Sequence, residues 1–405
     1  MRKAAALLAL ATSACASDYI ARTRGVRQSY ESYDYPGALK ALEPEDKGPV
    51  IDKLLVLLDR GMILHAAGKY EESIKVLAEA DKLSQQLDFT SVSEEASALV
   101  TNERERAYRG EDFEKLMVSV LQALNYAELK RDEDALVEIR RVNERMRKMI
   151  NEEKKPYQQL AIARYLGGVL YEDQGDEDAA FIDYSEAERL AGNLGALADA
   201  LVRLARRTGR DDAYRTLKTK YPAADETDLT RSEGQLVVVV EAGLSPQKEP
   251  ADRHEEHNGA VEIIKVPAYQ DRGAPPQVTV RIGDAAEPTV TVTSLREVAK
   301  THLEDRIGRM VAKQLAGAAV KAGIGVAAAQ LTDSKAIGEL TFILLSALNA
   351  ADLRSWLSLP AEFQIARFRL PSGKMSVHVE GHGKTTEHDV EINPGRVTLL
   401  TVRRY

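Results

Sequence analysis

Three histidines near the C-terminus have the residue type and spacing that come closest to a metal site. His378, His382 and His388 lie with Glu380 and Glu387 on two stretches that alternate apolar and polar residues, so a β-hairpin could bring them together. Imidazole and carboxylate groups are ligands for transition metals. The alternative is that these side chains form the polar outer face of a half-buried hairpin. A metal-assisted hydrolase is therefore one function that the sequence leaves open.

Two other motifs resemble catalytic boxes but miss the required spacing. The stretch His254–His257 has histidines three residues apart, whereas a zinc-protease box needs them four apart on a helix. Gly383–Thr385 ends like a phosphate loop, but His378 stands where the first glycine of that loop belongs. No serine lies in a G-x-S-x-G elbow. We therefore predict no catalytic residue, no cofactor and no identified small-molecule substrate.

The charge of the chain limits its partners. The 405 residues carry a net charge of -8, and 29% of them are charged. An acidic chain argues against nucleic acid or anionic lipid as the main partner. The mixed-sign run Glu138–Arg145 is typical of a solvated helix face. Because Cys15 is the single cysteine, no intrachain disulfide can form, and packing must stabilise the fold.

The first 16 residues have the pattern of a bacterial lipoprotein signal peptide. A positive segment, Met1–Lys3, precedes an apolar run, Ala4–Ala11, that is too short for a bilayer span of about 20 residues. Cys15 would become the acylated first residue, although Thr12 occupies a position that is usually aliphatic. The alternative is cleavage after Ala16, which would release a soluble protein. Both readings predict export.

A duplicated helix pair organises the first half of the chain. Six residues (Gly61, Leu64, Gly68, Ser73, Leu77 and Ala80) recur 107 positions later as Gly168, Tyr171, Gly175, Ala180, Tyr184 and Ala187. This spacing matches the tetratricopeptide pattern. A degenerate copy lies 62 positions after the first and has Lys130 in place of the turn glycine, and a further pair surrounds Gly209. We expect a stack of helix pairs over residues 50–222.

The first helix of each pair should line a concave wall of this stack. That wall would carry five residues that could contact a partner: His65, Glu128, Tyr165, Glu172 and Asp173. Their charge makes the wall mildly acidic. The predicted partner is therefore a protein or peptide with a basic segment.

The second half of the chain changes to an extended pattern. Leu236–Val240 is a continuous apolar run that predicts a strand buried on both faces. Further strands are expected at 261–266, 278–282, 290–293, 362–370, 374–380, 387–392 and 397–403, and Ser245–Gly259 is expected to be a loop. An Ala/Gly-rich helical hairpin over 294–351 either covers the sheet or offers a surface for a partner helix or the lipid interface.

These patterns predict an α+β fold. Residues 17–49 should form a tether with a short helix at Tyr35–Leu42, residues 50–222 an all-α tetratricopeptide-like repeat, and residues 223–233 a linker. Residues 234–405 should form a β-rich domain that the hairpin 294–351 interrupts.

Several stretches resemble an uncharacterised family of bacterial lipoproteins. They are Tyr108-x-Gly110 with Phe113-Glu114, Ala123–Tyr126, Ala135–Glu138 with Arg140-Arg141, Leu170–Glu172, Glu241-x-Gly243-Leu244, and Ala351–Pro360 with its Arg-Ser-Trp-x-x-Leu-Pro core. The resemblance implies tetratricopeptide-like helices, a strand-rich C-terminal domain and no known catalytic residue. It also implies an envelope protein connected with cell-wall synthesis or outer-membrane assembly. Ala16 after Cys15 favours a lipid anchor on the periplasmic side of the outer membrane, with a soluble periplasmic or secreted form as the alternative.

Overall fold

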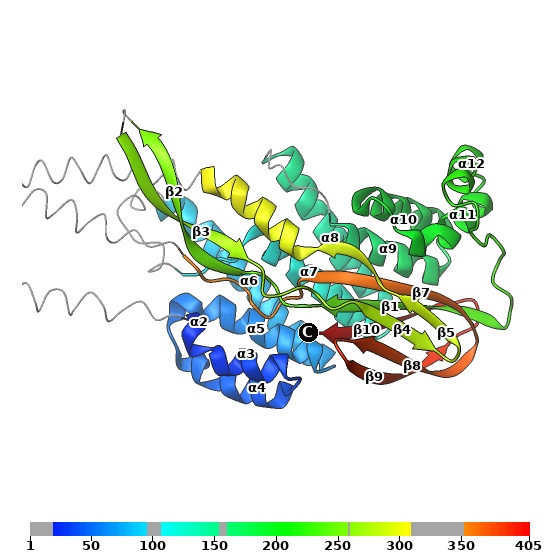
Figure 1. Cartoon of the computed structure of the whole chain (residues 1–405), viewed down its shortest axis with the longest axis horizontal. Coiled ribbons are helices and arrows are strands. Elements are labelled where there is room, and N and C mark those ends of the chain that lie inside the picture. Colours follow the sequence, from blue (N-terminus) through cyan, green and yellow to red (C-terminus); the bar gives the residue numbers. More distant parts are fainter. Residues whose placement is uncertain (1–18, 95–106, 154–159, 258–259, 309–351) are drawn as a thin grey trace, which may run out of the picture.

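Helices and strands both contribute to the structure, a computed structural model that describes residues 19–94, 107–153, 160–257, 260–308 and 352–405 (Figure 1). Cys15 and most of the Ala/Gly-rich hairpin, residues 309–351, lie outside the described residues. The first part of that hairpin is helical over residues 295–308. Among the described helices, none combines the length and apolarity that crossing a bilayer requires.

Four helix pairs follow one another where the sequence predicts them. They are α5 (Lys53–Ala66) with α6 (Tyr70–Glu94), α7 (Asp112–Glu128) with α8 (Asp132–Asn151), α9 (Ala161–Gln174) with α10 (Glu177–Ala191), and α11 (Ala198–Arg207) with α12 (Asp211–Lys220). Gly68, Gly175 and Gly209 take positive φ angles of 71°, 79° and 67° at the turns. Lys130 adopts the same left-handed backbone with φ 58°. The repeat therefore keeps its turn geometry where the glycine is missing.

Small residues in the first helices let the second helices pack closely. A Cβ atom built on Gly61 would overlap Leu77, and one built on Gly168 would overlap the ring of Tyr184. Leu77 and Tyr184 are fully buried, so neither can move into solvent. The recurring small and large residues therefore make the same packing contact within each of these two helix pairs.

Gly168→Ala is expected to lower the free energy of unfolding by about 1–3 kcal/mol, because the added methyl group forces Tyr184 out of its packed position. Gly195→Ala is the matched control, since nothing lies within 4 Å of a Cβ built there. Urea unfolding of both variants measures the effect. Equal stability of the two variants would show that the close approach is relaxed in solution.

The N-terminal segment is more ordered than the predicted tether. Residues 19–49 form α2 (Tyr19–Arg22), α3 (Arg24–Glu31), α4 (Tyr35–Leu42) and the 3-10 turn η1 (Glu43–Lys47), and η2 (Val50–Asp52) leads into α5. Tyr19, Tyr30 and Leu42 are buried. Tyr30 donates a hydrogen bond to the carbonyl of Ser358 (3.0 Å). The tether prediction was wrong because these aromatic residues pack onto α5 and the C-terminal half, whereas the helix at 35–42 is confirmed.

The part of the chain that the structure describes contains ten strands, which form three sheets. They are β1 (Glu233–Ala242), β2 (Gln247–His257), β3 (Ala260–Gln270), β4 (Val278–Ile282), β5 (Ala285–Pro288), β6 (Val290–Ser294), β7 (Glu362–Pro371), β8 (Gly373–Gly381), β9 (Lys384–Ile392) and β10 (Val397–Arg404). The strand orders are β10-β1-β7-β6, β2-β3 and β5-β4-β8-β9. The loop predicted at 245–259 was wrong, because backbone pairing from Gln247 opposite Gln270 to His257 opposite Ala260 makes a hairpin from a polar segment.

The central strand β1 is buried on both faces, as its apolar run predicts. It pairs in parallel with β10 and antiparallel with β7. Val237 and Val239 belong to the core shared with the helices, whereas Leu236, Val238 and Val240 pack against β4, β8 and β9. These parts of the molecule therefore form three layers, with the sheet β10-β1-β7-β6 between the helical stack and the sheet β5-β4-β8-β9 (Figure 1).

Candidate functional site

The wall that the sequence assigns to a peptide is covered by the chain's own sheet. The five predicted wall residues are His65 on α5, Glu128 on α7, and Tyr165, Glu172 and Asp173 on α9. Four of them bind β1, β7 or β10 directly. Tyr165 is fully buried and packs against the ring of Tyr184, and burial raises its pKa to about 12. The described residues therefore leave no open groove at this wall.

Two of these carboxylates cap the edge of the first sheet. The edge strand β10 would expose unpaired amides, which invite pairing with another chain. The amide of Val397 donates to Asp173 Oδ1 (2.7 Å), and the amide of Thr401 donates to Glu128 Oε1 (2.6 Å). Asp173 also pairs with Arg396 (2.6 Å). The last turns of α7 and α9 therefore satisfy backbone groups that a free sheet would leave open.

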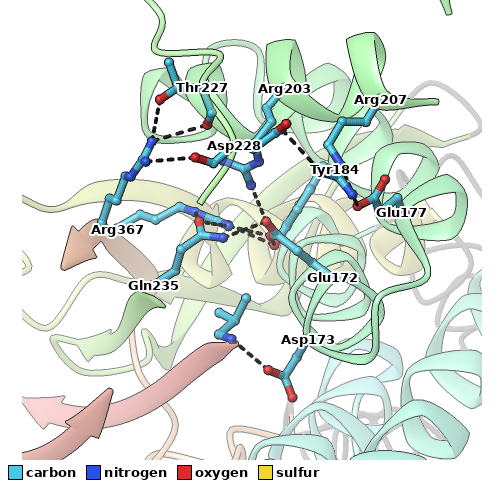
Figure 2. Close-up of polar contacts among 12 residues, drawn as sticks. Glu172, Asp173, Glu177, Tyr184, Arg203, Arg207, Thr227, Asp228, Gln235 and Arg367 are labelled. Atoms are coloured by element: carbon cyan, nitrogen blue, oxygen red, sulfur yellow. Dashed lines mark hydrogen bonds and ion pairs between the residues drawn. The ribbon is translucent and has the colours of Figure 1, made fainter. Parts of the chain in front are cut away.

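Glu172 is the centre of a buried ion network, which Figure 2 shows between the helices and the sheet. It pairs with Arg203 of α11 and Arg367 of β7. It also accepts hydrogen bonds from Gln235 Nε2 (2.8 Å) and the hydroxyl of Tyr184 (2.7 Å). Burial raises the pKa of this carboxyl, but Arg367 and Arg203 outweigh burial and lower the pKa to about 2. Glu172 is therefore an ionised bridge joining three repeat helices to two strands.

A second buried link connects His65 to the central strand. His65 Nε2 lies 3.2 Å from Glu241 Oε2, and Nδ1 lies 2.6 Å from Asn125 Oδ1. Burial lowers the pKa of His65, but the Glu241 carboxylate and the hydrogen bonds to Glu241 and Asn125 together raise the pKa by a larger amount, so the net shift is upward. Asn125 donates to Ser73 Oγ (3.0 Å), which in turn donates to the carbonyl of Gly61 (2.7 Å). Since Asn125 separates the serine from the histidine, the set lacks the direct contact that acyl transfer needs.

The loop Arg354–Pro360 is bound by three carboxylates of the helical half. The contacts are Arg354 Nη1 to Asp52 Oδ1 (3.0 Å), the Trp356 amide to Glu114 Oε1 (2.7 Å) and Ser358 Oγ to Asp59 Oδ1 (2.6 Å). Trp356 is fully buried, and its indole N–H donates to Ser358 Oγ (2.9 Å). This loop therefore locks the two halves together at the end of the first sheet.

Glu114, which accepts the Trp356 amide of this loop, has a raised carboxyl pKa. Burial, followed by the nearby charge of Glu111, raises its pKa to about 7, although Lys248 opposes the shift. The hydroxyl of Tyr108 donates to Glu114 Oε2 (2.5 Å), and so does the amide of Glu111 (2.9 Å). Because the folded protein holds a proton here more tightly than the unfolded chain, Glu114 stabilises the fold at low pH. That contribution is lost as the pH rises from about 4.5 through 7.

Glu114→Gln is expected to abolish the loss of folding stability that Glu114 causes as the pH rises. Glu114 should make the natural protein about 2 kcal/mol less stable at pH 7 than at pH 5, which follows from about 1.4 kcal/mol per pKa unit. The other groups titrate in both proteins, so the difference between the two pH profiles isolates Glu114. Urea unfolding at pH 5 and pH 7 measures it. Parallel profiles would contradict a raised pKa at this carboxyl.

The three C-terminal histidines do not meet. His378 lies opposite Glu387, whereas His388 lies opposite Val377, which is buried in the core between the sheets. His382 occupies the hairpin turn with φ 47°. No group of three His, Cys, Asp or Glu residues in the described part of the chain is arranged to hold a metal ion. Strand alternation separates these histidines, so the metal-assisted hydrolase gains no support.

A cleft on the outside of the repeat stack is the feature that the sequence does not reveal. Its volume is about 450 Å³, and it lies between α8, α9 and α10. Its apolar surface comes from Ile139, Tyr171 and Ile182, and its basic groups are Arg140, Arg147 and Arg164. We call it the α8–α10 cleft. Two of its arginines, Arg140 and Arg147, lie within and just after the run Glu138–Arg145, which has the pattern of an ordinary solvated helix face.

Comparisons with known proteins give only distant likenesses. No protein-family model matches the chain, and no curated protein matches it. A crystal structure of MamA protein covers 52% of this chain and 96% of its own, with 15% identity and a TM-score of 0.33. A structure described as MamA AMB-1 covers 51% and 91%, with 18% identity and a TM-score of 0.32. Likenesses with TM-scores this low carry no argument about function.

Proposed function

We propose that this chain is a protein-binding scaffold. The observation that carries the proposal is the α8–α10 cleft, a hollow of about 450 Å³ on a helical repeat stack whose other wall is covered by its own sheet. Repeat stacks expose extended binding surfaces because each helix pair contacts only its neighbours. The sequence, in turn, offers no spacing that meets a catalytic motif. Binding therefore accounts for the open surface better than catalysis does.

We further propose that the scaffold works in the bacterial envelope, anchored through an acylated Cys15 on the periplasmic side of the outer membrane. The support is the leader pattern of residues 1–16 and the resemblance to a lipoprotein family. Mass spectrometry of the mature N-terminus is the direct check. A diacylated Cys15 is expected, and an unmodified chain that starts at Ser17 would remove the anchor.

Crosslinking in native envelopes tests the scaffold itself. A photoreactive residue replaces Ile182 in the cleft in one variant and Val50, an exposed residue before α5, in another. A binding scaffold should form defined crosslinked products with a partner protein from at least one of these positions. If neither position gives more crosslinked product with light than without light, the scaffold function is wrong.

A further inference from the structure

We propose that the α8–α10 cleft binds an acidic peptide segment of a partner protein, one that also carries apolar side chains. This inference rests on the proposed scaffold function and adds the binding face and the chemistry of the partner. It differs from the basic partner that the wall residues predicted, because that wall holds the sheet.

The charge of the cleft comes from one ridge of α8. Arg140 and Arg147 are exposed, and neither has an ion-pair partner among the described residues. By contrast, Arg141 and Arg145 on the same helix are paired with Glu138 (2.9 Å) and Asp81 (2.8 Å). Unpaired guanidinium groups can bind carboxylates in bidentate geometry. Two free arginines on an acidic chain therefore favour a negatively charged partner.

The floor of the cleft is electrically balanced. Arg164 of α9 pairs with Asp183 of α10 at 2.7 Å. Glu144 lies on the same ridge as the free arginines and offsets one of them. The lining therefore has three basic and two acidic side chains, a net charge of +1. The excess of positive charge lies at the exposed rim, where a partner would arrive.

Apolar side chains flank the same cleft. The described residues include three large hydrophobic side chains that are strongly exposed, and two of them are Val137 (44%) on α8 and Ile182 (55%) on α10. Val137 lies three residues before Arg140, on the same helix face. Exposed apolar groups beside polar ones mark interaction sites when they cluster. The partner segment therefore needs apolar side chains beside its carboxylates.

The spacing of the arginines defines the segment. Arg147 lies seven positions after Arg140 on α8, which places the two residues about 10.5 Å apart along the helix axis. A segment in the polyproline II conformation advances about 3.1 Å per residue with three residues per turn, so carboxylates three residues apart lie on one face about 9.3 Å apart, close to this distance. A segment with glutamates at i and i+3 and leucines beside them fits both the arginines and the apolar side chains that flank the cleft.

Fluorescence anisotropy with a synthetic peptide tests the assignment. The probe is a fluorescein-labelled Leu-Glu-Leu-Ala-Glu-Leu peptide, titrated with the full chain at low salt. The double variant R140E/R147E should weaken binding at least about tenfold, because it replaces attraction with repulsion at both ends. Glu144→Gln should strengthen binding. The matched control R24E/R231E reverses one arginine on α3 and one in the turn before β1, both exposed and without an ion-pair partner among the described residues, and should leave binding unchanged.

Three results would overturn the inference. They are no saturable binding of the probe, equal binding by R140E/R147E and the control, or equal binding of a peptide with glutamine in place of both glutamates. The envelope crosslinks separate this failure from failure of the scaffold function. If partner crosslinks persist unchanged in R140E/R147E, the cleft assignment is wrong and the scaffold function remains. If the natural chain forms no partner crosslinks at all, both the scaffold function and the cleft assignment are wrong.

Discussion

Replacing Glu172 by glutamine is expected to lower the free energy of unfolding by about 3–5 kcal/mol. The glutamine has nearly the same shape but no charge, so Arg203 and Arg367 would remain buried beside a neutral group. Only 7% of the Glu172 side chain is exposed, so water cannot replace the lost carboxylate. The effect is measured by urea unfolding of the purified chain at pH 7.

Glu177→Gln is the matched control for this prediction. Glu177 pairs with Arg207 at a site where the two side chains are 29% and 41% exposed. A surface pair of this kind contributes about 0–1 kcal/mol. If Glu172→Gln lowered the free energy of unfolding as little as Glu177→Gln does, this would contradict a buried network at the centre of the interface.

The pH dependence gives a second measure of the same network. Because the pKa of Glu172 is lowered to about 2, its contribution is present above about pH 4.5 and is lost as the pH falls toward 2. Glu172→Gln should therefore flatten the acid limb of the stability profile relative to the natural protein. An unchanged acid limb would show that Glu172 keeps an ordinary pKa.

Trp356→Ala is expected to lower the free energy of unfolding by about 3–5 kcal/mol. Trp356 is the only tryptophan in the chain and is fully buried. Its loss opens a cavity and removes the hydrogen bond that positions Ser358 Oγ against Asp59. Circular dichroism during urea unfolding measures the change.

Trp356→Phe is the control, because it keeps most of the ring and loses the indole N–H. We expect a loss of about 1–2 kcal/mol from the unpaired Ser358 contact and the smaller ring. In the natural protein, the emission of Trp356 should be blue-shifted and should move to the red on unfolding. Emission typical of exposed tryptophan in the folded protein would contradict this placement of the loop.

Local contacts explain which parts of the fold can be predicted from the sequence. The small-to-large contact of Gly61 with Leu77 joins residues 16 positions apart and recurs with Gly168 and Tyr184. A contact that repeats at fixed spacing leaves a visible pattern. The apolar run of β1 is similarly visible, because burial on both faces removes polar residues.

Long-range and backbone-driven features are not predictable in this way. Glu172 lies on α9, the first helix of its pair, but its partner Arg367 lies 195 positions later. No periodicity links two such residues, so the wall resembles an open groove in sequence. The strand β2 was missed for a different reason: its pairing depends on backbone groups, and its polar side chains resemble a loop.

The central claim is that the chain's own sheet covers the first-helix wall, and amide hydrogen exchange at β10 tests it most directly. The amide N–H groups of Val397 and Thr401 donate hydrogen bonds to Asp173 and Glu128. Both amide protons should therefore exchange about as slowly as those in the interior of β1. The double variant E128A/D173A should make both amides exchange quickly. Rapid exchange of both amides in the natural protein, as fast as in the exposed β8–β9 turn, would show that the wall is open and would contradict the account.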